Sequence, residues 1–374
     1  MLKKLLIVVM CIALLGFIGV GCKTEAAPAE EAMEEAADDG IIGDLAGTKI
    51  GFVNAGPDDY YAVLGNGLKG IGELYGFEFT ELNSDYKPEK ELSNVQDLVA
   101  KGVDAIVVIT AGAAGSAATI DAANAADVPI FFIAGKPAIN EGGKVTGHVT
   151  DNFVIMGYGV GKWIVDNVED PVAVNIPGFL GQGPAEGLIV GFNLAFSEAG
   201  LEEPFLTASS EWQRTLAIPI TQDLIASGRE FNVLYACNEE TAAGVLTVFE
   251  EQNVEGVTMI SANGKEEGWA WLESGQMSAT APNPPPLNGD LCIQQIVRHL
   301  NGEDFVESLQ IMPWDVLTKD NLDKAIPWIM EDYLEGRANN DFEWDLAFYE
   351  KAYKDNADSF VEFDEMLNDY LANN

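Results

Sequence analysis

The sequence is poor in the residues from which metal sites and many catalytic sites are built. Its 374 residues include only two histidines and four cysteines. His148 and His299 lie far apart and match no metal-ligand spacing, so neither a zinc site nor histidine-based catalysis is expected. The sequence also has no phosphate loop of the Walker type and no Gly-x-Ser-x-Gly nucleophile elbow. We therefore expect no enzyme, no cofactor and no metal ion.

Basic residues are also scarce. The chain has 20 Lys and Arg against 60 Asp and Glu, which gives a formal net charge of −40. Nucleic-acid binding needs a basic surface that releases counterions, so nucleic acid is excluded as a partner. A highly solvated acidic surface accounts for this excess without any ligand, and a cationic ligand is the alternative. Acid pairs are unavoidable at this composition and do not indicate a glycosidase.

The cysteines are too few for a disulfide scaffold. Cys11 lies in an apolar run, Leu5 to Val20, that follows two lysines and has the length of a signal-peptide core or a short anchor helix. Cys22 follows this run directly. Only Cys237 and Cys292 remain, and the sequence leaves open whether they are paired.

Cys22 is the candidate site of lipid attachment. Gly19-Val20-Gly21-Cys22 resembles the lipobox of bacterial lipoproteins, in which the cysteine receives lipid and becomes the mature N-terminus. Gly19 departs from the usual leucine, and an uncleaved anchor helix is the alternative. We expect a signal peptide at 1–21 and a lipid-anchored acidic tether at 22–45, because the tether has few large apolar groups. The remainder is then periplasmic or at the cell surface, anchored to the membrane by lipid.

The body of the chain alternates strands and helices. Apolar runs such as Val103 to Ile109 indicate strands buried on both faces of a sheet. Ser93 is expected to cap a helix that Gly102 ends. After Asp151 the alternation starts again, with a strand at 204–210 and a helix at 220–228 among its elements. Two successive units of this kind predict an α/β fold with two parallel-sheet lobes facing each other across a cleft.

Several segments in order resemble the periplasmic sugar-binding proteins of the ribose-binding type, which deliver solutes to ABC transporters. They include "KIGFVNAGPDDYYAVLGNGLKG", "VPIFFIAGK", "GHVTDNFVIMGYGVGKWI", "ACNEETAAGV", "ISANG" and "ATAPN". The resemblance runs from about Thr48 to about Leu322. It implies a periplasmic binding protein-like fold of type I, with two Rossmann-like lobes joined by three crossings. Matching the crossings gives lobe one as 46–150 and 284–312, and lobe two as 151–283 and 313–322.

The resemblance also implies ligand-binding residues directly after the strands of each lobe. In lobe one they are Asp58, Tyr60 and Tyr61, whose rings and carboxylate suit the C–H faces and hydroxyls of a sugar. The two tyrosines could instead begin a helix and pack on their own lobe. The other implied positions are Thr150 before the turn Asp151-Asn152, Trp212, Asn238 and Asn263 in lobe two, and Asn283 in the hinge. Trp212 could instead be a core residue, and asparagines suit turns without any ligand.

Two departures from the family affect the ligand. Pentose-binding members carry Asp-Arg where this chain has Ala134, Gly135 and Lys136, and an arginine where it has Glu186. Lys136 can supply a positive charge but not the paired hydrogen bonds of an arginine, so ribose is doubtful as the ligand. Glu186, with Asp58 and Trp212, would suit an amine or amino sugar. An acid at a helix N-terminus is also favourable without ligand, which is the alternative for Glu186.

The segment 323–374 lies beyond the ordinary family length. Leu346, Tyr349 and Tyr353 have the spacing of an amphipathic helix, so we expect a helical acidic extension. Its apolar stripe either packs on a lobe or recruits a partner. The expected function is capture of a small sugar-like ligand, a monosaccharide or polyol, and its delivery by a monomer to the permease of an ABC transporter. The alternative is a receptor that presents its closed form to a membrane signalling partner.

Overall fold

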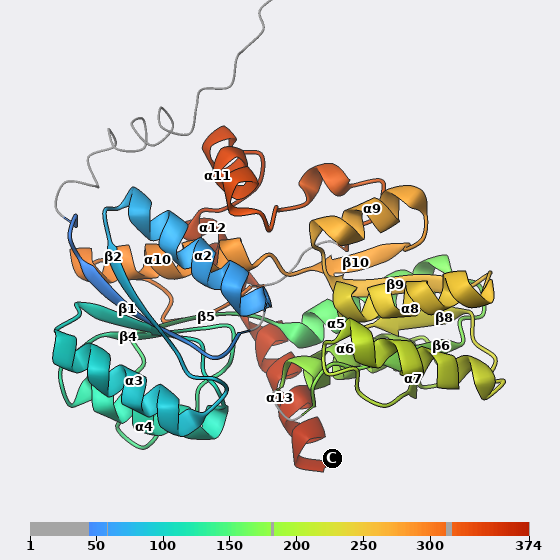
Figure 1. The fold of residues 1–374 in the computed structure, drawn as a ribbon, viewed down its shortest axis with the longest axis horizontal. Coiled ribbons are helices and arrows are strands. Elements are labelled where there is room, and N and C mark those ends of the chain that lie inside the picture. Colours follow the sequence, from blue (N-terminus) through green and yellow to red (C-terminus); the bar gives the residue numbers. More distant parts are fainter. Residues whose placement is uncertain (1–44, 58, 181–182, 312–315, 374) are drawn as a thin grey trace, which may run out of the picture.

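Two α/β lobes lie side by side (Figure 1). The computed structural model describes residues 45–374 apart from 58, 181–182, 312–315 and 374. The expected signal peptide, Cys22 and the acidic tether to residue 44 lie outside these residues. The fold class predicted from the sequence, two parallel-sheet lobes with a helical C-terminal extension, is confirmed.

Lobe one contains a six-stranded parallel sheet. Its strands follow the order β11-β5-β4-β3-β1-β2. They are β1 (Lys49–Asn54), β2 (Glu78–Asn83), β3 (Ala105–Val108), β4 (Ile130–Ile133), β5 (Gly147–Asp151) and β11 (Ser308–Ile311). Every residue of β3 and β4 is buried, as expected for central strands covered by helices on both faces.

The helices of lobe one are α2 (Asp59–Leu74), α3 (Pro88–Lys101), α4 (Ala113–Asn124) and α10 (Pro285–Asn301). The expected cap at Ser93 is wrong, because α3 begins five residues earlier at Pro88 and Ser93 lies inside it. Proline fits the first turn of a helix, where its missing N–H is not needed. The expected end at Gly102 is confirmed: its φ is 70° and its N–H donates to the carbonyl of Leu98.

Lobe two contains a five-stranded parallel sheet in the order β10-β9-β8-β6-β7. Its strands are β6 (Ala173–Ile176), β7 (Phe205–Leu206), β8 (Val233–Ala236), β9 (Thr258–Asn263) and β10 (Ala279–Pro282). Its helices are α5 (Phe153–Asn167), α6 (Pro184–Glu198), α7 (Arg214–Ala226), α8 (Glu239–Gln252) and α9 (Glu266–Ser274). The strand expected at 204–210 is shorter, since β7 pairs only at the sheet edge. The helix expected at 220–228 starts earlier, at Arg214, with Pro219 in its interior.

The chain passes between the lobes at three places before the extension. It leaves lobe one after β5, where the Asn152 side chain caps α5. It returns between β10 and α10, at Asn283 and Pro284. The third passage lies between β11 of lobe one and Leu317 of lobe two. On its far side Leu317 pairs with Thr280 of β10 in an antiparallel bridge.

The C-terminal extension adds a fourth passage between the lobes. It contains the 3-10 helix η2 (Leu322–Lys324), α11 (Met330–Asn339), α12 (Leu346–Asp355) and α13 (Ala357–Asn373). Ala325 packs against the core of lobe two, whereas Tyr333, Leu346 and Tyr349 are part of the core of lobe one. The apolar stripe of the extension therefore packs on a lobe, which was one of the two alternatives.

A buried ion pair fixes α11 to lobe one. Arg337 Nε of α11 donates to the Asp290 carboxylate of α10 at 2.7 Å. Asp290 is fully buried, and its carboxylate also accepts from Tyr333 Oη at 3.0 Å and Gln294 Nε2 at 2.9 Å. The guanidinium lies over the ring of Trp344 at 3.8 Å from the centroid. The extension is thus built into lobe one through polar as well as apolar contacts.

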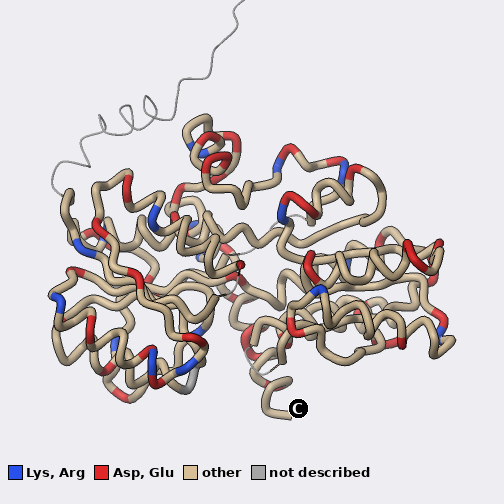
Figure 2. Tube along the Cα trace, in the orientation of Figure 1, with Lys and Arg blue, Asp and Glu red and all other residues tan. Residues whose placement is uncertain are grey.

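The remaining cysteines and the charges agree with a reduced, acidic protein. Cys237 and Cys292 are free and buried, and burial raises the pKa of Cys237 to about 11. Figure 2 shows acidic residues spread over both lobes and the extension. No helix within the described ranges has the length and apolar character needed to cross a membrane.

Candidate functional site

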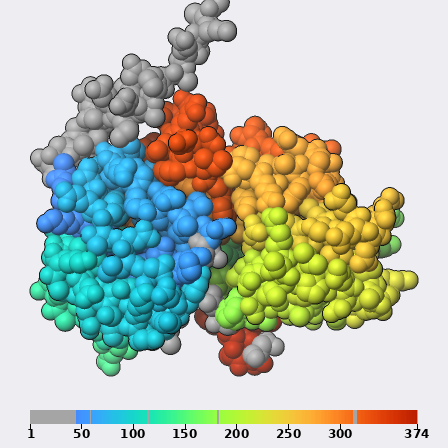
Figure 3. Space-filling view, in the orientation of Figure 1, coloured from blue at the N-terminus to red at the C-terminus, as the bar shows by residue number. Residues whose placement is uncertain are grey.

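The candidate site lies between the lobes, where the expected ligand residues follow their strands. In Figure 1 helix α2 points its N-terminal end toward lobe two. Figure 3 shows the two lobes side by side, with part of the C-terminal extension between them at the upper centre. In parallel α/β sheets, ligands bind beyond the carboxyl ends of the strands, and these are the ends that carry the expected residues.

Three of the expected residues form a connected path from one lobe to the other. Tyr60, at the start of α2 in lobe one, donates its hydroxyl hydrogen to Asn283 Oδ1 in the hinge at 3.1 Å. The main-chain N–H of Asn283 donates to the Asn263 carbonyl at the end of β9 in lobe two, at 2.8 Å. The arrangement therefore brings a lobe-one residue, a hinge residue and a lobe-two residue into one hydrogen-bonded group.

Two residues that the sequence reasoning missed complete this group. Asn288 Nδ2 of α10 donates to Asp151 Oδ2 at 2.8 Å and lies 3.5 Å from the Tyr60 hydroxyl. Burial raises the pKa of Asp151 to about 7. Burial, followed by the nearby Asp151 carboxyl, raises the pKa of Tyr60 well above its usual range. Asp151 belongs to the turn that was noted after Thr150, so its place at the end of a strand could have identified it as a candidate site residue.

Aromatic side chains pack around the phenol ring of Tyr60. Tyr61 lies edge-on to it, with ring centroids 5.9 Å apart. Trp328, from the extension, lies edge-on to it at 5.8 Å. Tyr86, after β2, packs on Tyr61 at 6.4 Å. Tyr61 and Trp328 both form edge-to-face pairs with Tyr60, which are favourable beyond their area burial, so these contacts restrict the orientation of the Tyr60 ring.

Trp212 and Asn238 lie together in lobe two. Asn238 Nδ2 donates to the Trp212 carbonyl at 3.3 Å, while its Oδ1 accepts from the Thr241 N–H and caps α8. The backbone of Trp212 has φ 64°, a left-handed conformation that is costly for a bulky residue. Its ring lies against Gly178 after β6, where an added Cβ would come within 2.4 Å of the indole. The glycine and the strained backbone together place this ring at the end of β6.

Glu239 holds the turn that carries Asn263. Its Oε1 accepts from the Gly264 N–H at 2.8 Å and from the Thr280 hydroxyl at 2.9 Å. Burial raises the pKa of Glu239 to about 8. Asn263 itself has φ 91°. A buried acid therefore fixes the strained end of β9, although sequence reasoning gave Glu239 no role.

Three other expected residues make contacts away from Tyr60 and Trp212. The Thr150 hydroxyl donates to the Ala134 carbonyl. The Glu186 carboxylate is buried and accepts from the Gly183 N–H at 2.9 Å, which caps its own helix. Lys136 pairs with Asp364 of α13 at 3.2 Å. Asp58 lies outside the described residues.

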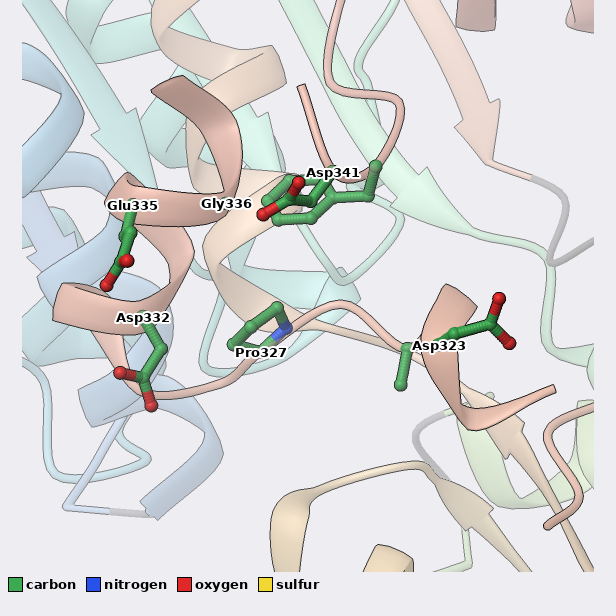
Figure 4. Close-up of a pocket in the computed structure, with 8 residues that line it drawn as sticks. Asp323, Pro327, Asp332, Glu335, Gly336 and Asp341 are labelled. Carbon is green, nitrogen blue, oxygen red and sulfur yellow. The ribbon is translucent and has the colours of Figure 1, made fainter. Parts of the chain in front are cut away.

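A small cavity of about 200 Å³ lies elsewhere, between residues 323–327 and α11. Its lining residues include four acids, Asp323, Asp332, Glu335 and Asp341, together with Pro327 and Phe342. In Figure 4 the Asp332 and Glu335 side chains extend on one side of α11, away from Asp341 and Asp323. Over the described ranges, no group of three or more His, Cys, Asp or Glu side chains is placed to hold a metal ion. None of the expected ligand residues lines this cavity.

Comparison with known proteins identifies the family. Residues 50–304 match the profile of the family described as "Periplasmic binding protein domain". The match ends before β11 and the helical extension. The extension, including Trp328 and α13, therefore lies outside the matched region.

Individual relatives are distant but extensive. The ribose import binding protein of Haemophilus influenzae is 26% identical over 247 residues, covering 65% of this chain and 82% of the relative. A solute-binding protein of Mycobacterium smegmatis, solved with bound glycerol, is 26% identical with a TM-score of 0.66, covering 74% of this chain and 96% of the other. The Caulobacter myo-inositol binding protein is similar in fold, with a TM-score of 0.68 at 18% identity, covering 74% of this chain and 95% of the other.

Proposed function

The chain belongs to the periplasmic binding protein domain family, and on that premise we propose that it captures a small sugar or polyol between its two lobes and delivers it to the permease of an ABC transporter. The family consists of transport solute-binding proteins and not of enzymes. The relatives' names concern ribose, xylitol, allose and myo-inositol. These compounds share several hydroxyls on a small carbon framework.

The observation that carries the proposal is the path from Tyr60 through Asn283 to Asn263. It links lobe one, the hinge and lobe two. Amides and a phenol both donate and accept hydrogen bonds, as hydroxyl groups do, and the rings around Tyr60 suit C–H faces. A ligand that bonds to both lobes stabilises the closed state by its additional contacts and shifts the equilibrium toward it.

A neutral ligand is favoured over an amine. The amine alternative combined Glu186 with Asp58 and Trp212, and the Glu186 carboxylate is buried and bonded to the N–H of Gly183. Lys136, which was to replace part of the missing arginine groups, is paired with Asp364. We therefore assign ligand contacts to Asp58, Tyr60, Tyr61, Trp212, Asn238, Asn263 and Asn283, and structural roles to Thr150, Lys136 and Glu186.

The test is a thermal-shift panel on the protein from residue 23 onward, which retains every described residue. The panel contains D-ribose, D-allose, L-arabinose, xylitol and myo-inositol, with glucosamine and small amines as the contrasting set. Ligand at a hundredfold excess over its dissociation constant stabilises the protein by about 2.7 kcal/mol, which raises Tm by several degrees. A shift with neutral compounds only is expected. A shift with amines only, or ligand recovered as a product, would contradict the proposal.

Anchoring of the protein through lipid on Cys22 is part of the same proposal. The family implies an extracytoplasmic location, and the lipobox-like residues before Cys22 support a lipid anchor. Several acyl chains hold a protein firmly, since each buried methylene stabilises the association by about 0.8 kcal/mol. Cys22→Ser should release the protein from the membrane fraction and abolish incorporation of labelled fatty acid. Retention of the variant in the membrane would favour an uncleaved anchor helix.

A further inference from the structure

Helix α13 lies between the two lobes, at the lower centre of Figure 1. Its inward face carries Phe360, Phe363, Leu367 and Tyr370, spaced three and four residues apart. Phe360 is buried against Tyr353 of α12, with ring centroids 4.8 Å apart, and the other three are half-buried. This pattern is that of an amphipathic helix laid on a surface.

Asp364 of α13 contacts lobe one. The carboxylate of Asp364 pairs with Lys136, which follows β4, at 3.2 Å. The same oxygen accepts from Gln310 Nε2 of β11 at 3.1 Å. These two partners lie at or just beyond the carboxyl ends of their strands, which is the side of the sheet that faces the other lobe.

The neighbouring residue Phe363 and the second half of the same helix contact lobe two. The Phe363 ring packs against Tyr158 of α5 with a centroid distance of 6.1 Å. Further along, α13 packs on α6. Tyr370 there has a pKa raised by burial and then by the charges of Glu186 and Glu203, both of lobe two. One rigid helix therefore rests on both lobes at once.

A hydrogen-bonded chain also connects α13 to the hinge. Gln310 donates to Asp364 and its Oε1 accepts from Asn152 Nδ2 at 2.7 Å. Asn152 is the first residue after β5, and its Oδ1 caps α5 by accepting from the Ile155 N–H at 3.0 Å. The contact of α13 with lobe one is thus only one side chain away from the residue at which the chain enters lobe two.

We propose that α13 is a strap that ties the two lobes together and restrains the angle between them. The helix can contact Lys136 and Gln310 in lobe one and Tyr158 in lobe two at the same time only at one angle between the lobes. Any hinge motion must break one set of contacts or the other. The strap therefore favours the geometry in which both sets are made, and its undocking is coupled to motion of the lobes.

One consequence of the strap rests on the proposed function: if the lobes close on a ligand, docking of α13 and ligand capture are linked through the interlobe angle. The extension is outside the region that matches the family. The device is accordingly an addition made by this chain to a two-lobed receptor. Its existence can be tested without any ligand, so a silent ligand panel and a failed strap are separate results.

The experiment measures the distance between spin labels on the two lobes by pulsed electron resonance. Lys101→Cys in α3 and Glu251→Cys in α8 provide exposed attachment sites, while Cys237 and Cys292 are buried. The distribution is recorded without ligand for the labelled parent, for Phe363→Ala, for Asp364→Ala and for a variant lacking residues 357–374. Val361→Ala is the matched control, since Val361 is on the same helix and 59% exposed.

We expect a single narrow distribution in the parent and in Val361→Ala. Phe363→Ala should broaden the distribution and add a population at longer distances, and the truncation should have a stronger effect of the same kind. Asp364→Ala should have a weaker effect, because Asp364 and Lys136 are partly exposed and exposed ion pairs contribute little. Superimposable distributions for the parent and Phe363→Ala would overturn the proposal. If the truncated chain fails to fold, the two point variants decide the question alone.

Discussion

The indole of Trp328 packs edge-on against the phenol ring of Tyr60, with centroids 5.8 Å apart and ring planes at 74°. The main-chain N–H of Trp328 donates to Glu266 of α9 in lobe two at 2.7 Å. Trp328 is thus held by lobe two through its backbone and by lobe one through its ring. This contact connects the C-terminal extension directly to the residue that begins the candidate ligand site.

Two replacements of Trp328 distinguish the contribution of its ring to stability from that of its indole N–H. The indole nitrogen is buried and has no hydrogen-bond partner among the described residues. A buried donor without a partner costs about 1–3 kcal/mol, so Trp328→Phe should leave the free energy of unfolding unchanged or raise it. Trp328→Ala should lower it by about 3–5 kcal/mol, because a large buried ring is lost. Both are measured by urea unfolding.

Trp344 provides the control within the same extension. Its indole N–H donates to Asn340 Oδ1 at 3.2 Å, so Trp344→Phe removes a bond that is made. That variant should not gain stability. If Trp328→Phe lost as much stability as Trp328→Ala, the indole N–H of Trp328 would have a hydrogen-bond partner. Our interpretation of the buried indole would then be wrong.

Trp212→Ala tests the wall of the site in lobe two. Loss of a stacked ring should weaken binding of the panel ligand at least about tenfold, or about 1.4 kcal/mol, by isothermal titration. Trp212 is half-buried and packs on the core of lobe two, so the melting temperature should also fall by a few degrees. Trp163→Ala in α5 is the matched control: Trp163 packs on the same core but is not an expected ligand residue, so this change should lower the melting temperature without changing the affinity. Unchanged affinity with a lower melting temperature for Trp212→Ala would make Trp212 a core residue.

The buried pair of Arg337 and Asp290 should be essential to lobe one. Arg337→Ala leaves the fully buried Asp290 carboxylate without its cation, which typically costs about 3–5 kcal/mol. The change is measured as the free energy of unfolding. Lys351→Ala removes an exposed pair with Asp355 in the same extension and should change that free energy by less than about 1 kcal/mol. Equally small effects of the two substitutions would mean that the Arg337–Asp290 pair does not stabilise lobe one.

The two lobes could be predicted because central strands such as β3 and β4 are apolar throughout. Runs such as Val103 to Ile109 suit only a sheet covered on both faces, and the order of segments identified the family. Ser93 misled the sequence reasoning because a hydroxyl residue before an apolar stripe resembles a cap, whereas Pro88 starts the helix. Local signals of this kind compete within a few residues, and packing decides between them.

The path of the extension could not be predicted. Its amphipathic spacing was visible, but spacing does not say which surface the stripe covers. Trp328 carries no local signal of its contact with Tyr60, which lies 268 positions earlier in the chain. Lys136 and Glu186 were expected at the ligand because the family places charged groups there. In this chain α13 and a helix cap provide their partners instead.

Asp151 predicts how stability depends on pH. Burial raises its pKa from 3.8 to about 7. Between these values the folded state holds a proton that the unfolded state has released. The contribution of Asp151 is therefore fully present below about pH 4 and is lost as the pH rises through 7. Asp151→Asn cannot ionise and can still accept from Asn288, so it should remove this part of the pH dependence.

The measurement is the free energy of unfolding of wild type and Asp151→Asn from pH 4 to pH 8. The two should agree near pH 4, and the variant should become the more stable by a few kcal/mol near pH 8. Glu239, whose raised pKa of about 8 acts in the same direction, is present in both proteins and cancels in the difference. Asp355→Asn controls for a change of charge at an exposed carboxyl. Parallel curves for wild type and Asp151→Asn would show that Asp151 is ionised in the folded protein, and that the hinge beside Tyr60 holds a charge rather than a protonated acid.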